Sequence, residues 1–218
     1  MADSPEISAS RAASYRPAAL VSTAVFAAFC GALVLYDPRY TQLAIYGLYA
    51  IPAHLLISFL PHEPALWIAA RLYPPIVVAL VGTAATLVAI VLDYWLIGWL
   101  VNHHLVKPVV QESRWFTFAS RWFRKAPALL IVGSALTPGL PFYPVKIMAI
   151  AADYPLRRFI VALIVGRLPR FYVLARFLAA LDNYAAPKNS TLMYIVLALA
   201  AFGAWRFWKA RKQVTARK

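Results

Sequence analysis

Charged side chains are scarce in this sequence. Only 14% of the 218 residues are Asp, Glu, Lys or Arg, whereas 62% are hydrophobic. Soluble domains usually hold about 25% charged and about 45–50% apolar residues. Because long apolar stretches also recur along the whole chain, the composition excludes an ordinary soluble domain. It predicts an all-α polytopic membrane protein with a single membrane domain.

Residues that form disulfides, metal sites and catalytic sites are also scarce. The single cysteine, Cys30, excludes an internal disulfide. There are only 8 acidic residues, and no second His or Cys lies at ligand spacing from His62. We therefore expect no metal, no cofactor and no catalytic residue, which makes a membrane enzyme acting on lipid phosphates the weaker interpretation. No GxxxG motif argues for a dimer, so the oligomeric state stays open.

Positive charge is in clear excess, with 22 Lys and Arg and a net charge of +14. These residues adjoin apolar segments, which is where the positive-inside rule places them, so we reject a nucleic-acid partner. The rule puts both termini in the cytoplasm: a tail at residues 1–17 and a basic tail at 209–218. The membrane domain is then expected at 18–208, with about four full transmembrane helices. A basic, Trp-rich stretch at about 107–126 is typical of an interfacial amphipathic helix.

Two apolar segments are broken by proline. LPHEP at 60–64 and LPFYP at 140–144 each separate two short arms, and Tyr-Pro follows each pair. An arm of about ten residues is about 15 Å long, half the hydrocarbon thickness. The pattern predicts an inverted repeat of two oppositely oriented re-entrant hairpins, at about 43–75 and about 128–153. We attribute their geometry to a set of turn residues: Pro61, Pro64, Pro138, Gly139, Pro141 and Pro144.

Three ionisable residues near the spans are candidates for a proton or substrate site: His62, Glu63 and Asp93. A carboxylate within a bilayer is costly and usually faces a cavity or a partner. Glu63 is a plausible proton carrier, but a structural role at the start of the return arm is equally compatible with its position. Asp93 is expected either to pair with an arginine in the bundle or to be exposed.

Arg167 and Arg170 are candidates for binding a lipid phosphate. They are three residues apart and share a helix face, and they flank Pro169, which would loosen the helix. Arginine suits bidentate phosphate recognition, although internal ion pairing or snorkelling are alternatives. Lys146 opens the return arm of the second hairpin, where it could meet an anionic head group or snorkel.

The order LPHEP, RLYPP, TPGLPFYP and GRLPRFY resembles the DedA/SNARE-associated (VTT-domain) membrane-protein family over roughly residues 40–180. The resemblance implies paired re-entrant hairpins, translocation of polyprenyl phosphate or phospholipid, and a bacterial inner membrane. The sequence departs from the pattern of the family at four places. Ala135 and Pro141 stand where bacterial members carry arginines, Ile51 stands where many carry a second acidic residue, and Trp99 stands where the family often has an arginine after Ile-Gly.

We therefore predict a flippase- or scramblase-like transporter of an anionic lipid, with possible proton coupling. A secondary transporter of a small ion or solute, built on the same hairpins, is the principal alternative. A non-catalytic membrane assembly factor, whose charges are purely structural, is a further one. The sequence alone does not choose the lipid, the direction or the energy source.

Overall fold

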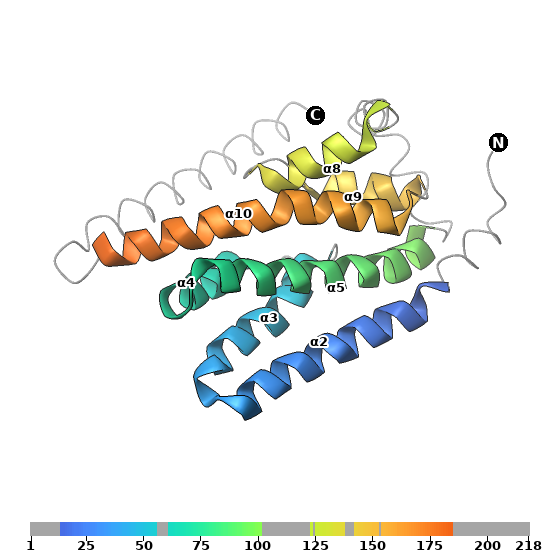
Figure 1. Cartoon of the computed structure of the whole chain (residues 1–218). Helices are drawn as coiled ribbons and strands as arrows, with labels where there is room; N and C mark the ends of the chain where they lie inside the picture. Colours follow the sequence, from blue (N-terminus) through green and yellow to red (C-terminus); the bar gives the residue numbers. More distant parts are fainter. Residues whose placement is uncertain are drawn as a thin grey trace, which may run out of the picture. The chain divides into compact units, whose positions relative to one another are not determined.

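All regular structure in the described part of the chain is helical (Figure 1). The computed structural model describes residues 14–55, 61–101, 123, 125–137, 142–152 and 154–184. Within these ranges there is no strand, which confirms the all-α prediction. The structure divides into two compact units, Met1–Arg176 and Phe177–Lys218. Every contact reported below lies within the first unit.

Three of the described helices are long. α2 covers Arg16–Tyr36, α5 covers Pro75–Val101, and α10 covers Leu156–Tyr184. Two stretches are long and apolar enough to cross a membrane: Arg16–Tyr36, with a mean hydropathy of 2.3, and Pro75–Leu96, with 2.5. α10 is long enough but is not one of these, and it carries five arginines: Arg157, Arg158, Arg167, Arg170 and Arg176.

The other α-helices given for the described residues are short and come in two pairs. Pair one joins α3 (Thr41–His54) to α4 (Glu63–Leu72), and pair two joins α8 (Pro127–Leu136) to α9 (Phe142–Ala151). At 1.5 Å per residue, the lengths are about 15–21 Å, so none of them spans about 30 Å of hydrocarbon. The breaks fall within the predicted segments at 43–75 and 128–153. Their re-entrant course through a membrane stays a prediction.

Proline sets most of these boundaries. Pro64 lies in the first turn of α4, where its missing N–H costs nothing, and Pro75 begins α5. Tyr73, before Pro74, is extended, with φ −132° and ψ 155°, and this ends α4. Pro144 lies in the first turn of α9. The other turn residues predicted for pair two, Pro138, Gly139 and Pro141, lie outside the described residues, as do most of segment 107–126 and the tail 209–218.

α5 is the helix that both pairs share. α3 and α4 pack on it from pair one (Figure 1). α9 packs on it from pair two. Apolar side chains of α5, α8, α9 and α10 form one buried cluster that includes Ile90, Ile131, Met148, Phe159 and Leu163. α2 packs against α3 and α5, while its other side leaves large apolar residues exposed: Leu20, Val21, Val25 and Phe29. An apolar surface of this kind is expected on a helix that faces lipid.

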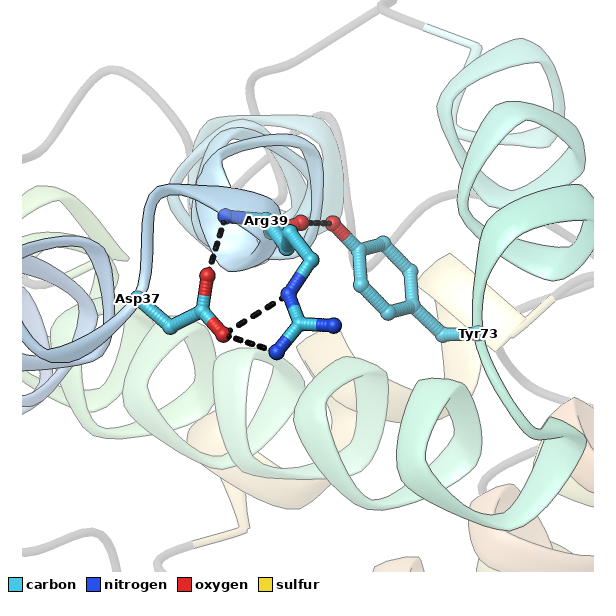
Figure 2. Close-up of polar contacts among 3 residues, drawn as sticks. All are labelled: Asp37, Arg39 and Tyr73. Carbon is cyan, nitrogen blue, oxygen red and sulfur yellow. Dashed lines mark hydrogen bonds and ion pairs between the residues drawn. The ribbon is translucent and has the colours of Figure 1, made fainter.

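The connection from α2 to α3 is fixed by polar contacts with the end of α4 (Figure 2). Asp37 Oδ1 accepts from the Arg39 amide at 2.9 Å, and its Oδ2 accepts from Arg39 Nε at 2.8 Å. The Tyr73 hydroxyl donates to the Arg39 carbonyl and accepts from the Leu43 amide at 3.3 Å. Tyr73 therefore ties the start of α3 to the end of α4. These two helix ends lie away from the break between the helices, and we call them the outer end of pair one.

Candidate functional site

α3 ends at a buried histidine. His54 Nδ1 donates to the Ala50 carbonyl at 2.7 Å, because a carbonyl oxygen can only accept. Nε2 of the neutral ring is then an acceptor, and it is buried without a hydrogen-bond partner among the described residues. The His54 ring lies 4.6 Å from the His62 ring, centroid to centroid. The two ends of pair one thus bring two imidazoles together. The sequence analysis gave His54 no role.

His62 and Glu63 mark the start of α4, as the sequence indicated. His62 is the N-cap residue, although its side chain makes no capping hydrogen bond in the described structure. Its Nδ1 lies 3.4 Å from Glu63 Oε1. Glu63 is in the first turn of α4, where the helix dipole favours an acid, and its side chain is 63% exposed. In this structure Glu63 lies at the rim of the site rather than in its buried part.

The two predicted arginines reach the same place from α10. Arg167 is only 5% exposed, and its guanidinium lies over the Phe142 ring of α9, with Cζ 4.6 Å from the centroid. Cζ is also 5.7 Å from the Phe171 ring, which has edge contacts with His54 and His62. Arg167 therefore lies next to the break between the two helices of each pair, which we call the inner end of the pair.

Both arginines hold unused donors. Nε of Arg167 and Nε of Arg170 are buried and have no hydrogen-bond partner in the described part of the chain. Both guanidinium groups interact electrostatically with Glu63, and they repel each other. Pro169, between them, lies inside α10 as predicted. Buried unpaired donors on a cation are costly, so their clustering indicates a place for an acceptor.

A third cation completes the cluster. Lys146 of α9 is 1% exposed, and its Nζ donates to Asp93 Oδ2 at 2.7 Å and to the His54 carbonyl at 2.6 Å. Asp93 of α5 is also 1% exposed. One partner of Asp93 is thus a lysine; the sequence had suggested an arginine or exposure. Lys146 points inward, so the snorkelling alternative is not the one observed.

The floor of the site is a close approach of α3 and α5. Tyr46, 1% exposed, places its hydroxyl where a side chain at Gly82 would lie: a Cβ there would be 2.2 Å from that oxygen. The Tyr46 hydroxyl and Thr83 Oγ1 are buried without partners among the described residues. Neither residue was singled out by the sequence, because an isolated Tyr or Thr in an apolar helix carries no signal until the helices meet.

The cluster as a whole is cationic. It holds three cations, Arg167, Arg170 and Lys146, and two acids: the buried Asp93, which pairs with Lys146, and the exposed Glu63, which interacts with both arginines. Buried charge of one sign is stable only when a counter-charge is close, so the arrangement is suited to an anion with several acceptor oxygens. The described residues contain no group of three or more His, Cys, Asp or Glu side chains that could hold a metal ion.

Paired short helices around a buried cationic cluster, beside long apolar helices, define a helical membrane protein with a polar internal site. The family profile of the VTT domain matches residues 60–180, more than half of the chain. The chain belongs to this family, the DedA/SNARE-associated membrane proteins, as the motifs predicted. No significant match was found among curated protein sequences or among solved structures.

Proposed function

We propose that this protein is a flippase- or scramblase-like transporter that moves an anionic lipid across a membrane, without catalysing a reaction and without a cofactor. The observation that carries the proposal is the meeting of Arg167 and Arg170, with their unpartnered buried Nε atoms, and the inner ends of both helical pairs. A phosphate cannot cross about 30 Å of hydrocarbon unassisted. Half-length helices with a cationic centre provide a short polar path.

His54 restricts the choice of lipid. Its Nε2 is an acceptor, so a head group that satisfies it must also donate a hydrogen. A singly ionised phosphomonoester, such as polyprenyl phosphate, offers anionic oxygens to Arg167 and a P–OH to His54. A phospholipid with an amine in its head group offers N–H donors instead. A phosphocholine head group has neither, so we expect phosphatidylcholine to be a poor substrate.

In this proposal both pairs are re-entrant hairpins of opposite orientation, joined to about four full crossings. Both termini are in the cytoplasm of a bacterial cell, and the protein resides in the inner membrane. The proposal includes proton coupling through Glu63 or Asp93, the two acids at the site. Cysteine labelling in a Cys30→Ser background tests the topology: cysteines at Lys212 and Ser14 should react from the cytoplasmic side, and one at Arg39 from the outside.

The decisive experiment is lipid flipping in proteoliposomes. The substrates are polyprenyl phosphate, phosphatidylethanolamine and phosphatidylcholine, with and without a pH gradient. The variants are Arg167→Ala and Glu63→Gln, with Arg176→Ala as the matched control, because Arg176 is an exposed arginine on the same helix. Loss of flipping in Arg167→Ala alone among the arginine variants supports the proposal. Absence of flipping of every lipid by folded wild-type protein would favour a solute transporter or an assembly factor.

A further inference from the structure

Among the described residues, acceptors are found for only two of the three ammonium hydrogens of Lys146, in a place where an anion is expected. Its ammonium group carries three hydrogens, and two of them serve Asp93 and the His54 carbonyl. Those partners come from α5 and from the end of α3, so the ammonium lies where both pairs meet. With 1% exposure, it cannot use water freely to satisfy the third hydrogen.

Lys146 and Arg167 share an aromatic neighbour. Nζ of Lys146 lies 5.5 Å from the centroid of Phe142, and Cζ of Arg167 lies 4.6 Å from the same centroid. The centroid of the Tyr143 ring lies 5.7 Å from the same Nζ. The two cations also repel each other electrostatically. An anion bound between them would remove that repulsion and take up the spare donors of both.

Asp93 acts against this attraction. Its carboxylate, 2.7 Å from Nζ, cancels most of the field of Lys146 at any nearby anion. A transport site needs such a limit, because a ligand must be bound strongly enough to enter and weakly enough to leave. An Asn at this position would keep the shape and a hydrogen-bond acceptor but would leave the lysine charge uncompensated.

We propose that Lys146 is a third cationic ligand of the anion site and that Asp93 lowers the affinity of the site so that the anion is released. The inference rests on the anion site of the proposed function, and it adds two residues from outside α10. A purely structural ion pair would instead stabilise the fold and leave the affinity for anions unchanged.

Binding of hexadecyl phosphate, a single-chain phosphomonoester, to detergent-solubilised protein tests the inference. We expect Lys146→Gln to weaken binding about tenfold, the effect of one lost charged hydrogen bond. We expect Asp93→Asn to strengthen binding about tenfold, because the lysine charge is no longer cancelled. It should also slow flipping, because release becomes slower. Hexadecyl phosphocholine, a phosphodiester with no hydrogen to donate, is the control ligand.

The signs of the two changes decide the outcome. The roles of Lys146 and Asp93 are overturned if both variants bind hexadecyl phosphate as wild type does, or if both bind it more weakly than wild type. If one variant fails to fold, the other decides by its sign. If both fail, Lys146→Met/Asp93→Asn decides, because it removes both charges, which largely cancel, together with the third donor hydrogen: the lost hydrogen bond should weaken binding several-fold, and unchanged binding overturns the inference. If Arg167→Ala binds hexadecyl phosphate with the affinity of the wild type, both the anion site and the proposed function are overturned.

Discussion

Gly166 of α10 lies so close to Ala135 of α8 that a Cβ on the glycine would be 2.6 Å from the Cβ of the alanine. The same Cβ would be 2.9 Å from the Val132 carbonyl oxygen, which is backbone and cannot rotate away. Contact at this distance is possible only without a side chain. Gly166 immediately precedes Arg167, so this approach determines how deep the arginine reaches into the site.

We expect Gly166→Ala to lower the free energy of unfolding by about 1–3 kcal/mol, the usual cost of overpacking. Gly133→Ala is the matched control, since a Cβ at Gly133 of α8 would meet no described atom within 4 Å. It should raise stability by about 0.5–1 kcal/mol, because alanine is the better helix former. Unfolding in mixed micelles of dodecyl maltoside and dodecyl sulfate measures both. Equal stability of the two variants would contradict the close approach.

Tyr73→Phe should loosen the outer end of pair one. The variant loses the donor to the Arg39 carbonyl and the acceptor for the Leu43 amide, each worth about 1 kcal/mol. Hydrogen exchange at Leu43 should therefore become faster. Tyr40→Phe serves as the control, because it keeps the ring that stacks on Tyr73 at 6.1 Å. Equal exchange at Leu43 in Tyr73→Phe and Tyr40→Phe would show that the Tyr73 hydroxyl does not hold the connection.

The stability of the α2–α3 connection should depend on pH through Asp37. The hydrogen bond from the Arg39 side chain and then that from its backbone amide lower the pKa of Asp37 below its ordinary value of 3.8. Because the folded-state pKa is the lower one, the stabilisation is complete above pH 3.8 and is lost as the pH falls through the folded-state pKa. The effect is small and is screened by salt, because the pair is exposed.

Carbon-13 NMR of the Asp37 carboxyl group in micelles measures this shift directly. In Arg39→Gln the pKa of Asp37 should move up toward its ordinary value, and the protection factor of the Leu43 amide, which corrects for the intrinsic exchange rate, should depend less on pH. An unchanged pKa in Arg39→Gln would rule out the Arg39 side chain as the cause.

Arg167→Lys should impair transport although it conserves the charge. Lysine is a point charge on a flexible stem, so it loses the planar stacking on Phe142 and the bidentate grip on a phosphate. We expect flipping of polyprenyl phosphate to slow about tenfold, equivalent to one lost charged hydrogen bond. Arg176→Lys, at an exposed position of α10, should leave the rate unchanged. Similar rates for both variants would mean that Arg167 acts only through its charge.

The sequence predicted the helix breaks well because their cause is local. Proline fixes its own φ and restricts the residue before it, so Tyr73-Pro74 had to end one helix wherever the neighbouring helices lay. The match to the VTT domain at 60–180 likewise follows from motifs that can be read directly. Arg167 and Arg170 were selected for a similar reason, since two arginines on one face of an apolar helix are conspicuous.

The composition of the site was harder to predict because it depends on contacts between distant segments. Lys146 and Asp93 are 53 residues apart, and Lys146 and the His54 carbonyl are 92 apart. No spacing rule relates such positions. His54 in an apolar helix is indistinguishable from an ordinary buried histidine, and Phe142 from any core aromatic. Only the packing of α9 and α10 makes Phe142 the surface on which Arg167 lies.

α3 is held at both of its ends by side chains of other helices. Its first turn is held by Tyr73, while its far end carries the His54 carbonyl that Lys146 grips at 2.6 Å. With 14 residues, α3 is about 21 Å long. A tilt of about 5° about the first turn moves the far end by about 2 Å at this rise per residue. Such a displacement exceeds the range of a hydrogen bond, so a slight swing of one short helix uncouples Lys146 from pair one.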